Sequence, residues 1–147
     1  MRQTNQGSDD GNGVRTSIAD ANAEVVRRAF AALNSNDFAA MAGLFHPDAA
    51  WYTPGRSVVA GEALGRDAVF ARFAQYFRAT GGTFRISLKK VLQSTDGRVA
   101  AIHHDRGERN GKHLNAGCCT IFDFEDGLIL EGMEHFHDLY TWDEFWS

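Results

Sequence analysis

Residues 98–136 read RVAAIHHDRGERNGKHLNAGCCTIFDFEDGLILEGMEHF, and apolar and polar side chains alternate over most of this stretch. A period of two is typical of β-strands with one buried face. Asn110-Gly111 and Asp126-Gly127 interrupt the alternation, and such dipeptides favour the tight turns of β-hairpins. The pattern predicts consecutive antiparallel strands at residues 98–108, 112–124 and 128–136.

The residues upstream of this stretch have helical spacing. Apolar side chains recur three and four positions apart, which indicates helices with one face against a core. Ser17 and Asp37 are suited to cap the first two helices, and Gly81 is suited to end the third. The expected elements are helices at residues 18–33, 38–45 and 68–79, a short strand at 49–53 and a longer strand at 83–92.

Three helices followed by an antiparallel meander predict an α+β domain. We expect a curved antiparallel sheet, wrapped by the three N-terminal helices into a cone with an apolar interior. Trp142, Phe145 and Trp146 lie at helical spacing near the end of the chain and are expected to cap the fold as a last turn of helix.

Composition limits the possible partners. The 147 residues suit one domain at residues 17–147, preceded by a polar stretch at 1–16 that is expected to be a disordered tail. The net charge is −4 and the basic residues are scattered, so we expect no nucleic-acid partner. No apolar run reaches the roughly 20 residues that a bilayer requires, and no signal peptide is visible, so we expect no membrane partner. The adjacent Cys118 and Cys119 favour a reducing compartment, the cytoplasm.

Three stretches resemble a known family. They are VVRRAFAALNSNDFAAMAGLFHPDAAWYTPG (25–55), WYTPGRSVVAGEALGRDAVFARF (51–73) and DGLILEGMEHFHDLYTWDEFWS (126–147). They are similar to the SnoaL-like and ketosteroid-isomerase-like members of the nuclear-transport-factor-2-like superfamily. The resemblance implies a cone-shaped fold, a small apolar ligand in the cone, and a homodimer formed through the outer sheet face.

The resemblance also places functional residues. The isomerase's two oxyanion donors and its general base fall at Ala29, Thr120 and Thr53, and none of these has the required group. This argues against steroid isomerisation by that mechanism. In epoxide-hydrolase-like members, a carboxylate on the last strand corresponds to Glu134, but their arginine falls near Ala101.

Strand alternation selects candidate catalytic residues. Glu134 shares a strand face with Leu128, Leu130, Gly132 and Phe136, a mostly apolar set that we expect to face the interior. Burial there raises a carboxyl pKa towards neutrality, as a general acid or base requires. The alternative is that Glu134 belongs to a structural ion pair or faces solvent.

The strand at 98–108 offers a second pair. His103 and Asp105 share a face with Val99 and Ala101, so the aspartate can orient the imidazole beside Glu134. The alternative is that His103 is a structural wall residue and Asp105 lies at the wet rim. By the resemblance, Tyr52 points into the cone, where its hydroxyl would donate to a substrate oxygen. The alternative is that Tyr52 is an aromatic wall residue with its hydroxyl at the mouth of the cone. The residues expected to bind substrate are Trp51, Phe70, Phe73, Phe77, Thr120, Phe122 and Phe136.

No metal or cofactor is expected. The six histidines match no zinc motif, no nucleotide-binding motif occurs, and His135 and His137 are expected on the outer sheet face. The interpretation is a SnoaL-like, cofactor-independent enzyme of isomerase, cyclase or dehydratase type, acting on an apolar carbonyl or hydroxyl compound. The alternatives are a non-catalytic module for apolar-ligand binding or dimerisation, and an epoxide hydrolase.

Overall fold

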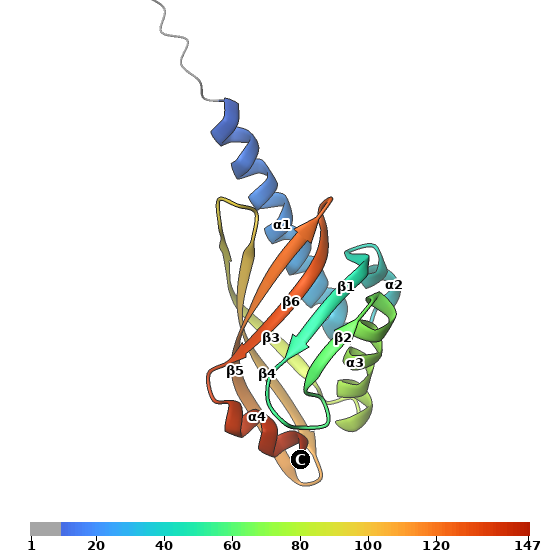
Figure 1. Cartoon of the computed structure of the whole chain (residues 1–147). Coiled ribbons are helices and arrows are strands. Elements are labelled where there is room, and N and C mark those ends of the chain that lie inside the picture. Colours follow the sequence, from blue (N-terminus) through green and yellow to red (C-terminus); the bar gives the residue numbers. More distant parts are fainter. Residues whose placement is uncertain (1–9) are drawn as a thin grey trace, which may run out of the picture.

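The computed structural model describes the backbone of residues 10–147 and the side chains from Ile18 onward. The elements of this part of the chain are shown in Figure 1. In order, they are α1 (Asp10–Asn34), α2 (Phe38–Ala42), β1 (Phe45–Thr53), β2 (Gly61–Leu64), α3 (Arg66–Ala79), β3 (Arg85–Gln93), β4 (Val99–Arg109), β5 (Lys112–Glu125), β6 (Leu128–Phe136) and α4 (Leu139–Trp146).

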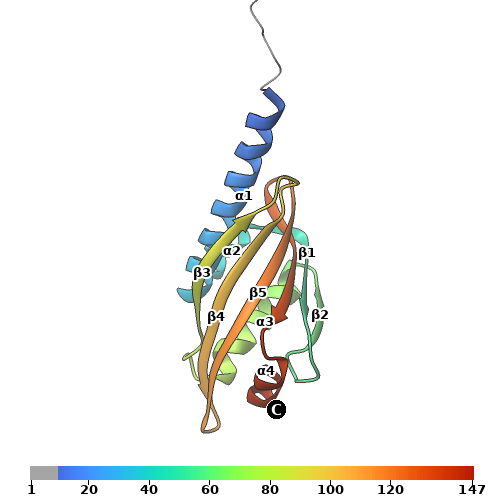
Figure 2. The ribbon, with the colours of Figure 1, turned by 90° about the vertical axis from the view of Figure 1, so that its left-hand side faces the viewer.

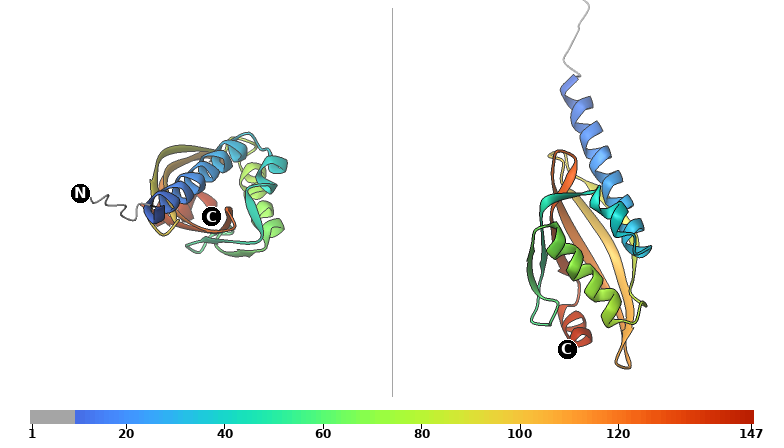
Figure 3. Two further views of the ribbon diagram at one scale, coloured as in Figure 1. Left: turned by 90° about the horizontal axis from the view of Figure 1, so that it is seen from above. Right: turned by 90° about the vertical axis from the view of Figure 1, so that its right-hand side faces the viewer.

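The strands form one curved sheet in the order β2-β1-β6-β5-β4-β3. Long strands β3 to β6 make the expected antiparallel meander, and helices α1 and α3 lie on its concave side (Figures 2 and 3). The prediction of an α+β cone is therefore confirmed. The sheet is mixed, however, because β1 pairs parallel with β6 and antiparallel with β2.

Several boundaries differ from those expected. Helix α1 begins at Asp10, so residues 10–16 are helical, whereas the sequence predicted a tail as far as residue 16. The rest of that predicted tail, residues 1–9, lies outside the described residues. Strand β2 was not predicted, because its four residues lack a clear alternation.

The second helix was expected to run to residue 45 and stop at Pro47. Instead, α2 ends at Ala42 after one turn, and Phe45 already belongs to β1. Pro47 is tolerated within a strand because the ladder to β6 is interrupted between Phe45 and Ala50, where no backbone N–H is required.

Strand β6 contains an irregularity that the sequence did not reveal. Phe124 pairs with Ile129, but Asp123 pairs with Glu131, so Leu130 is an extra residue. A bulge of this kind reverses which side chains face inward. Ile129 is therefore fully buried, and the prediction that Leu128 and Leu130 share the inner face with Glu134 is wrong.

Helix α4 closes one end of the cone. Trp142 and Trp146 are fully buried, and the Phe136 ring stacks on Trp142 at 4.0 Å between centroids. The Asp143 carboxylate accepts hydrogen bonds from the backbone N–H groups of Arg56 and Ser57 in the β1–β2 loop, at 3.0–3.2 Å. The C-terminal helix is thus bound both to the aromatic core and to a loop near the start of the sheet.

Candidate active site

A small cavity lies between the sheet and the helices, and every side chain around it is buried. Its free volume is about 20 Å³, which is room for about one water molecule. The wall is mostly aromatic and aliphatic, with six side chains that carry a polar atom, two of them aromatic. The lining residues are Ala29, Phe30, Leu33, Met41, Phe45, Trp51, Phe73, Tyr76, Phe84, Ile86, His103, Asp105, Thr120, Phe122 and Glu134.

Glu134 presents a buried carboxyl group to this cavity from β6. Its side chain accepts a hydrogen bond at Oε2 from Thr53 Oγ1 (2.8 Å), and Thr53 in turn accepts one from Arg72 (3.3 Å). Burial raises the pKa of Glu134 to about 7, and the Asp105 charge acts in the same direction. The Thr53 hydrogen bond and the charge of His103 offset part of this rise.

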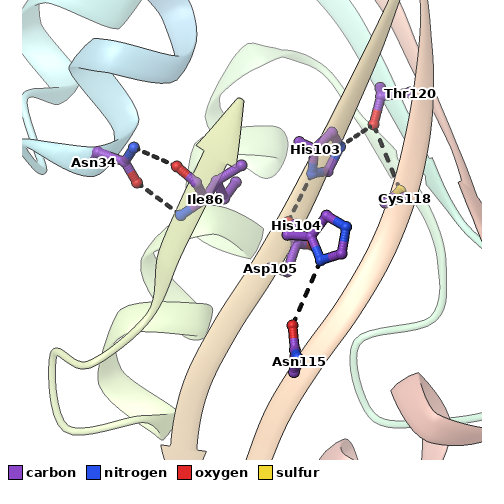
Figure 4. Close-up of polar contacts among 8 residues, drawn as sticks. All are labelled: Asn34, Ile86, His103, His104, Asp105, Asn115, Cys118 and Thr120. Atoms are coloured by element: carbon purple, nitrogen blue, oxygen red, sulfur yellow. Dashed lines mark hydrogen bonds and ion pairs between the residues drawn. The ribbon is translucent and has the colours of Figure 1, made fainter. Parts of the chain in front are cut away.

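His103 lies between Asp105, on its own strand β4, and Thr120, on the neighbouring strand β5 (Figure 4). Its Nδ1 is 2.7 Å from Asp105 Oδ1 and its Nε2 is 2.9 Å from Thr120 Oγ1. Burial opposes the charged ring, but the charge and hydrogen bond of Asp105 outweigh it, so the pKa of His103 is raised. In the imidazolium form, Nδ1–H donates to Asp105 and Nε2–H donates to Thr120.

The structure brings three of the four predicted catalytic residues together. Glu134, His103 and Asp105 all line the cavity and are 6%, 1% and 1% exposed, so Asp105 is not at a wet rim. Tyr52 does not join them, and its predicted inward orientation is wrong. Trp51 takes the inward position on β1, and the Tyr52 phenol lies near Glu131, whose charge raises its pKa.

Four of the seven residues expected to bind substrate line the cavity, namely Trp51, Phe73, Thr120 and Phe122. The other three pack elsewhere. Phe70 contacts Phe38 and Phe45, and Phe77 contacts Phe84, while Phe136 stacks on α4. They belong to the aromatic core around the cavity and do not line it, so their role in substrate binding stays a prediction.

Two further residues of the site, Thr53 and Tyr76, were not among those predicted from the sequence. Thr53 was noted only for lacking the isomerase's carboxylate, yet its hydroxyl binds Glu134. Tyr76 lies on the buried face of α3, where its hydroxyl is the one polar group. A single hydroxyl among buried aromatic positions was the available signal.

The thiol of Cys118 offers no nucleophile. Burial raises its pKa far above the usual range, and the nearby Glu134 charge adds to the rise. The thiolate is therefore not formed near neutral pH. Acid–base chemistry at Glu134 and His103 is better supported by this environment than covalent chemistry at sulfur.

Gly132 on β6 allows the Trp51 indole to lie against the cavity wall. A Cβ at residue 132 would overlap the Trp51 ring, which lies opposite it on β1. Gly132→Ala is expected to lower the free energy of unfolding by about 1–3 kcal/mol, because the indole must move. Urea denaturation measures this loss.

Gly117→Ala is the matched control for this variant. Gly117 is also a strand residue, but a Cβ there meets its neighbours only at 3.7 Å, an ordinary contact distance. We expect little change in stability. Equal losses in the two variants would contradict the assigned role of Gly132.

Within the described residues, no group of three or more His, Cys, Asp or Glu side chains is placed to hold a metal ion. His135 and His137 are exposed, whereas the two site acids are buried. In the same part of the chain, no helix combines the length and apolar character needed to cross a membrane.

Comparison with known proteins shows the family and the fold of this chain. The family model of the SnoaL-like domain matches residues 26–132. The chain belongs to the SnoaL-like family. Among SnoaL-like relatives, the uncharacterized protein Rv0034 of Mycobacterium tuberculosis (strain ATCC 25618 / H37Rv) is 34% identical over 128 residues, covering 87% of this chain and 98% of that protein.

Two solved structures extend the comparison of this SnoaL-like chain. Bal32a, from a soil-derived mobile gene cassette, is 52% identical with a TM-score of 0.88, covering 88% of this chain and 99% of Bal32a. A protein of unknown function with a cystatin-like fold from Xanthomonas campestris is 26% identical with a TM-score of 0.79, covering 86% of this chain and 98% of that one. The cone fold is therefore shared along nearly the whole length of both proteins.

Proposed function

We propose that this SnoaL-like protein is a cofactor-independent enzyme that transfers protons on an apolar carbonyl or hydroxyl compound, in an isomerase, cyclase or dehydratase type of reaction. The observation that carries the proposal is the Glu134 carboxyl group, buried in an apolar cavity with a pKa of about 7. A group with this pKa is populated in both protonation states near neutral pH, as general acid–base catalysis requires.

The neighbouring groups support this role. In the proposed reaction, the Glu134 carboxylate accepts a proton from a carbon or hydroxyl of the substrate, and the resulting acid returns it at another position. Asp105 favours the charged form of His103, and in the proposed reaction that positive charge stabilises the negative charge formed on the substrate. Thr53 fixes the Glu134 carboxyl group by hydrogen bonding to one of its oxygens.

Two alternative functions would use the same cavity. In a non-catalytic binding module, the cavity holds an apolar ligand without chemistry. Epoxide hydrolysis is less well supported, since among the described residues no arginine lines the cavity. Arg72 reaches the site only through Thr53.

The size of the cavity constrains each function. About 20 Å³ is far below the roughly 300 Å³ or more of ordinary ligand sites. Side chains of the wall must therefore move when an organic ligand enters, in an enzyme or in a binding module.

The test is hydrogen exchange at the carbon next to a ketone. Small cyclic ketones such as 1-indanone and 2-tetralone are incubated with the protein in deuterated water, and exchange is followed by NMR. We expect exchange faster than in buffer at the same pH. Binding of the ketones, seen as a raised melting temperature, with exchange at the buffer rate would instead support the binding module.

We further propose that two copies pair through the outer face of the sheet, the side away from the helices (Figure 2). Ile102 and Met133 alternate with inward-facing His103 and Glu134, and are 37% and 42% exposed. Burial of these apolar side chains supports self-association. Light scattering is expected to give the mass of a dimer, and a monomer mass at high concentration would contradict the proposal.

A further inference from the structure

Two polar atoms in the cavity wall have no hydrogen-bond partner. They are the Tyr76 hydroxyl oxygen and the Trp51 indole nitrogen, on side chains that are 2% and 6% exposed. The other polar side chains of the wall, Glu134, His103, Asp105 and Thr120, each make at least one hydrogen bond. Buried polar groups without a partner are uncommon and unfavourable, so each needs an explanation.

Both atoms belong to the surroundings of Glu134. Burial raises the pKa of Tyr76 most and the Glu134 charge adds to the rise, while weak hydrogen-bonding contacts lower the pKa of Tyr76 (from Thr53) and that of Glu134 (from Trp51). Neither contact has the geometry of a full hydrogen bond, and the Thr53 hydroxyl already donates to Glu134 and accepts from Arg72. Tyr76 comes from α3 and Trp51 from β1, so the two donors lie on different walls of the cavity.

The remaining unpartnered indoles are different. Trp142 and Trp146 also lack partners, but they do not line the cavity. Their rings pack against Tyr76 at 5.9 and 5.3 Å between centroids, inside the aromatic core. Among the described side chains, only Tyr76 and Trp51 therefore combine an unpartnered donor with a position at the cavity.

We propose that Tyr76 and Trp51 form a subsite for one hydrogen-bond-accepting oxygen of the ligand, a carbonyl oxygen or the oxyanion derived from it, beside Glu134. The inference rests on the proposed function, because both require a ligand in this cavity. It adds the chemical class of the group recognised and the two residues that recognise it.

The chemistry of the two donors fits this oxygen. Trp51 can only donate, and the phenol of Tyr76 remains protonated because burial holds its pKa well above the usual value. When Glu134 removes a proton from the carbon next to a carbonyl group, the electron pair moves to the oxygen. Both donors strengthen their hydrogen bonds to that oxygen as its charge grows, and neither loses its proton.

The experiment compares 1-indanone with indane, which has nearly the same shape and no oxygen. Binding is followed by tryptophan fluorescence or NMR, in the wild type and in Tyr76→Phe. We expect the wild type to prefer the ketone by about tenfold or more, and the variant to lose most of this preference with indane binding unchanged. Trp51→Phe is expected to weaken the same preference.

The ligand-free variant gives a second readout. Because Tyr76→Phe removes an unpartnered buried hydroxyl, we expect a melting temperature about 2–4 °C higher than that of the wild type. Tyr52→Phe is the matched control, since that hydroxyl lies outside the cavity, and it should change neither the preference nor the melting temperature. Trp142→Phe is the control for Trp51→Phe in the binding measurement alone: it lowers the melting temperature because the indole is fully buried, but it should keep the ketone preference.

Three results would overturn the subsite. They are failure of the wild type to prefer the ketone, a preference unchanged in Tyr76→Phe, or a lower melting temperature with both probes weakened equally. The outcome is separable from the proposed function. If Tyr76→Phe loses the ketone preference but the wild type catalyses no exchange, the subsite is supported and the proposed enzyme activity is contradicted. If the wild type catalyses exchange but Tyr76→Phe keeps the preference, the enzyme activity is supported and the subsite is contradicted.

Discussion

Glu134→Gln is expected to slow proton exchange on a bound ketone by a factor of about 10² to 10⁴, the usual contribution of a general acid or base. Glutamine has nearly the same shape and keeps an oxygen that can accept the hydrogen bond from Thr53. Its amide group neither accepts nor releases a proton as an acid or base near neutral pH. The rate should therefore fall while the ketone still binds.

The pH dependence of stability checks the same residue. The pKa of Glu134 rises from an ordinary 4.5 to about 7 on folding. Below pH 4.5 the carboxyl is protonated in both states, and its favourable contribution is complete. Between pH 4.5 and about 7 the unfolded chain ionises while the folded carboxyl stays protonated, so stability is lost as pH rises, by about 3 kcal/mol in total, and the loss is complete once pH has passed the folded-state pKa. Glu134→Gln should remove this decline.

Glu131→Gln is the matched control for both measurements. Glu131 lies on the same strand but does not line the cavity. We expect its variant to exchange protons at the wild-type rate and to keep the decline in stability. If Glu134→Gln behaves as Glu131→Gln does, Glu134 is not the acid–base group.

Asp105→Ala is expected to lower the free energy of unfolding by about 3–5 kcal/mol at pH 6. The reason is that Asp105 and His103 form a buried pair at 2.7 Å, and loss of one partner leaves the other charge or polar group unpaired in the core. Asp105→Asn should cost less, since the amide oxygen can still accept a hydrogen bond from His103 Nδ1–H. Urea denaturation of both variants measures the difference.

The sign of the pH effect follows from the pKa of His103, which is raised above 6.5 by Asp105. The stabilisation from the pair is complete below pH 6.5 and is lost as pH rises through the folded-state pKa. Both Asp105 variants should lose this part of the pH dependence. Asp123→Ala, which removes a more exposed ion pair with Arg98, is the control and should leave it intact. A pH profile unchanged by Asp105→Ala would contradict a charged His103.

The sequence predicts which side chains face the cavity wherever the alternation of the strand is regular. Strand β4 pairs without interruption from Val99 to Arg109, so His103 and Asp105 lie on the inner face as expected. Glu134 also faces inward, but the bulge at Leu130 separates it from the apolar residues that were used to place it. A bulge depends on pairing with two neighbouring strands, and the sequence of β6 alone does not contain that information.

The errors on β1 and in the helices have a related cause. Tyr52 and Trp51 are adjacent, and only one can face inward; the choice depends on Gly132, which leaves room for the indole across the sheet. The unpartnered hydroxyl of Tyr76 was likewise invisible, because spacing shows that a helix position is buried but not which polar groups surround it. The roles of Glu134, His103 and Asp105 remain predictions.

The most direct measurement is the pKa of Glu134 itself, from carboxyl ¹³C chemical shifts followed against pH in the wild type, with Glu134→Gln used to assign the signal. The account predicts a carboxyl group that titrates at about 7. A Glu134 signal that titrates near its ordinary value of 4.5 would show that the carboxyl group is charged and well solvated at neutral pH, and would contradict its role as the acid–base group of the cavity.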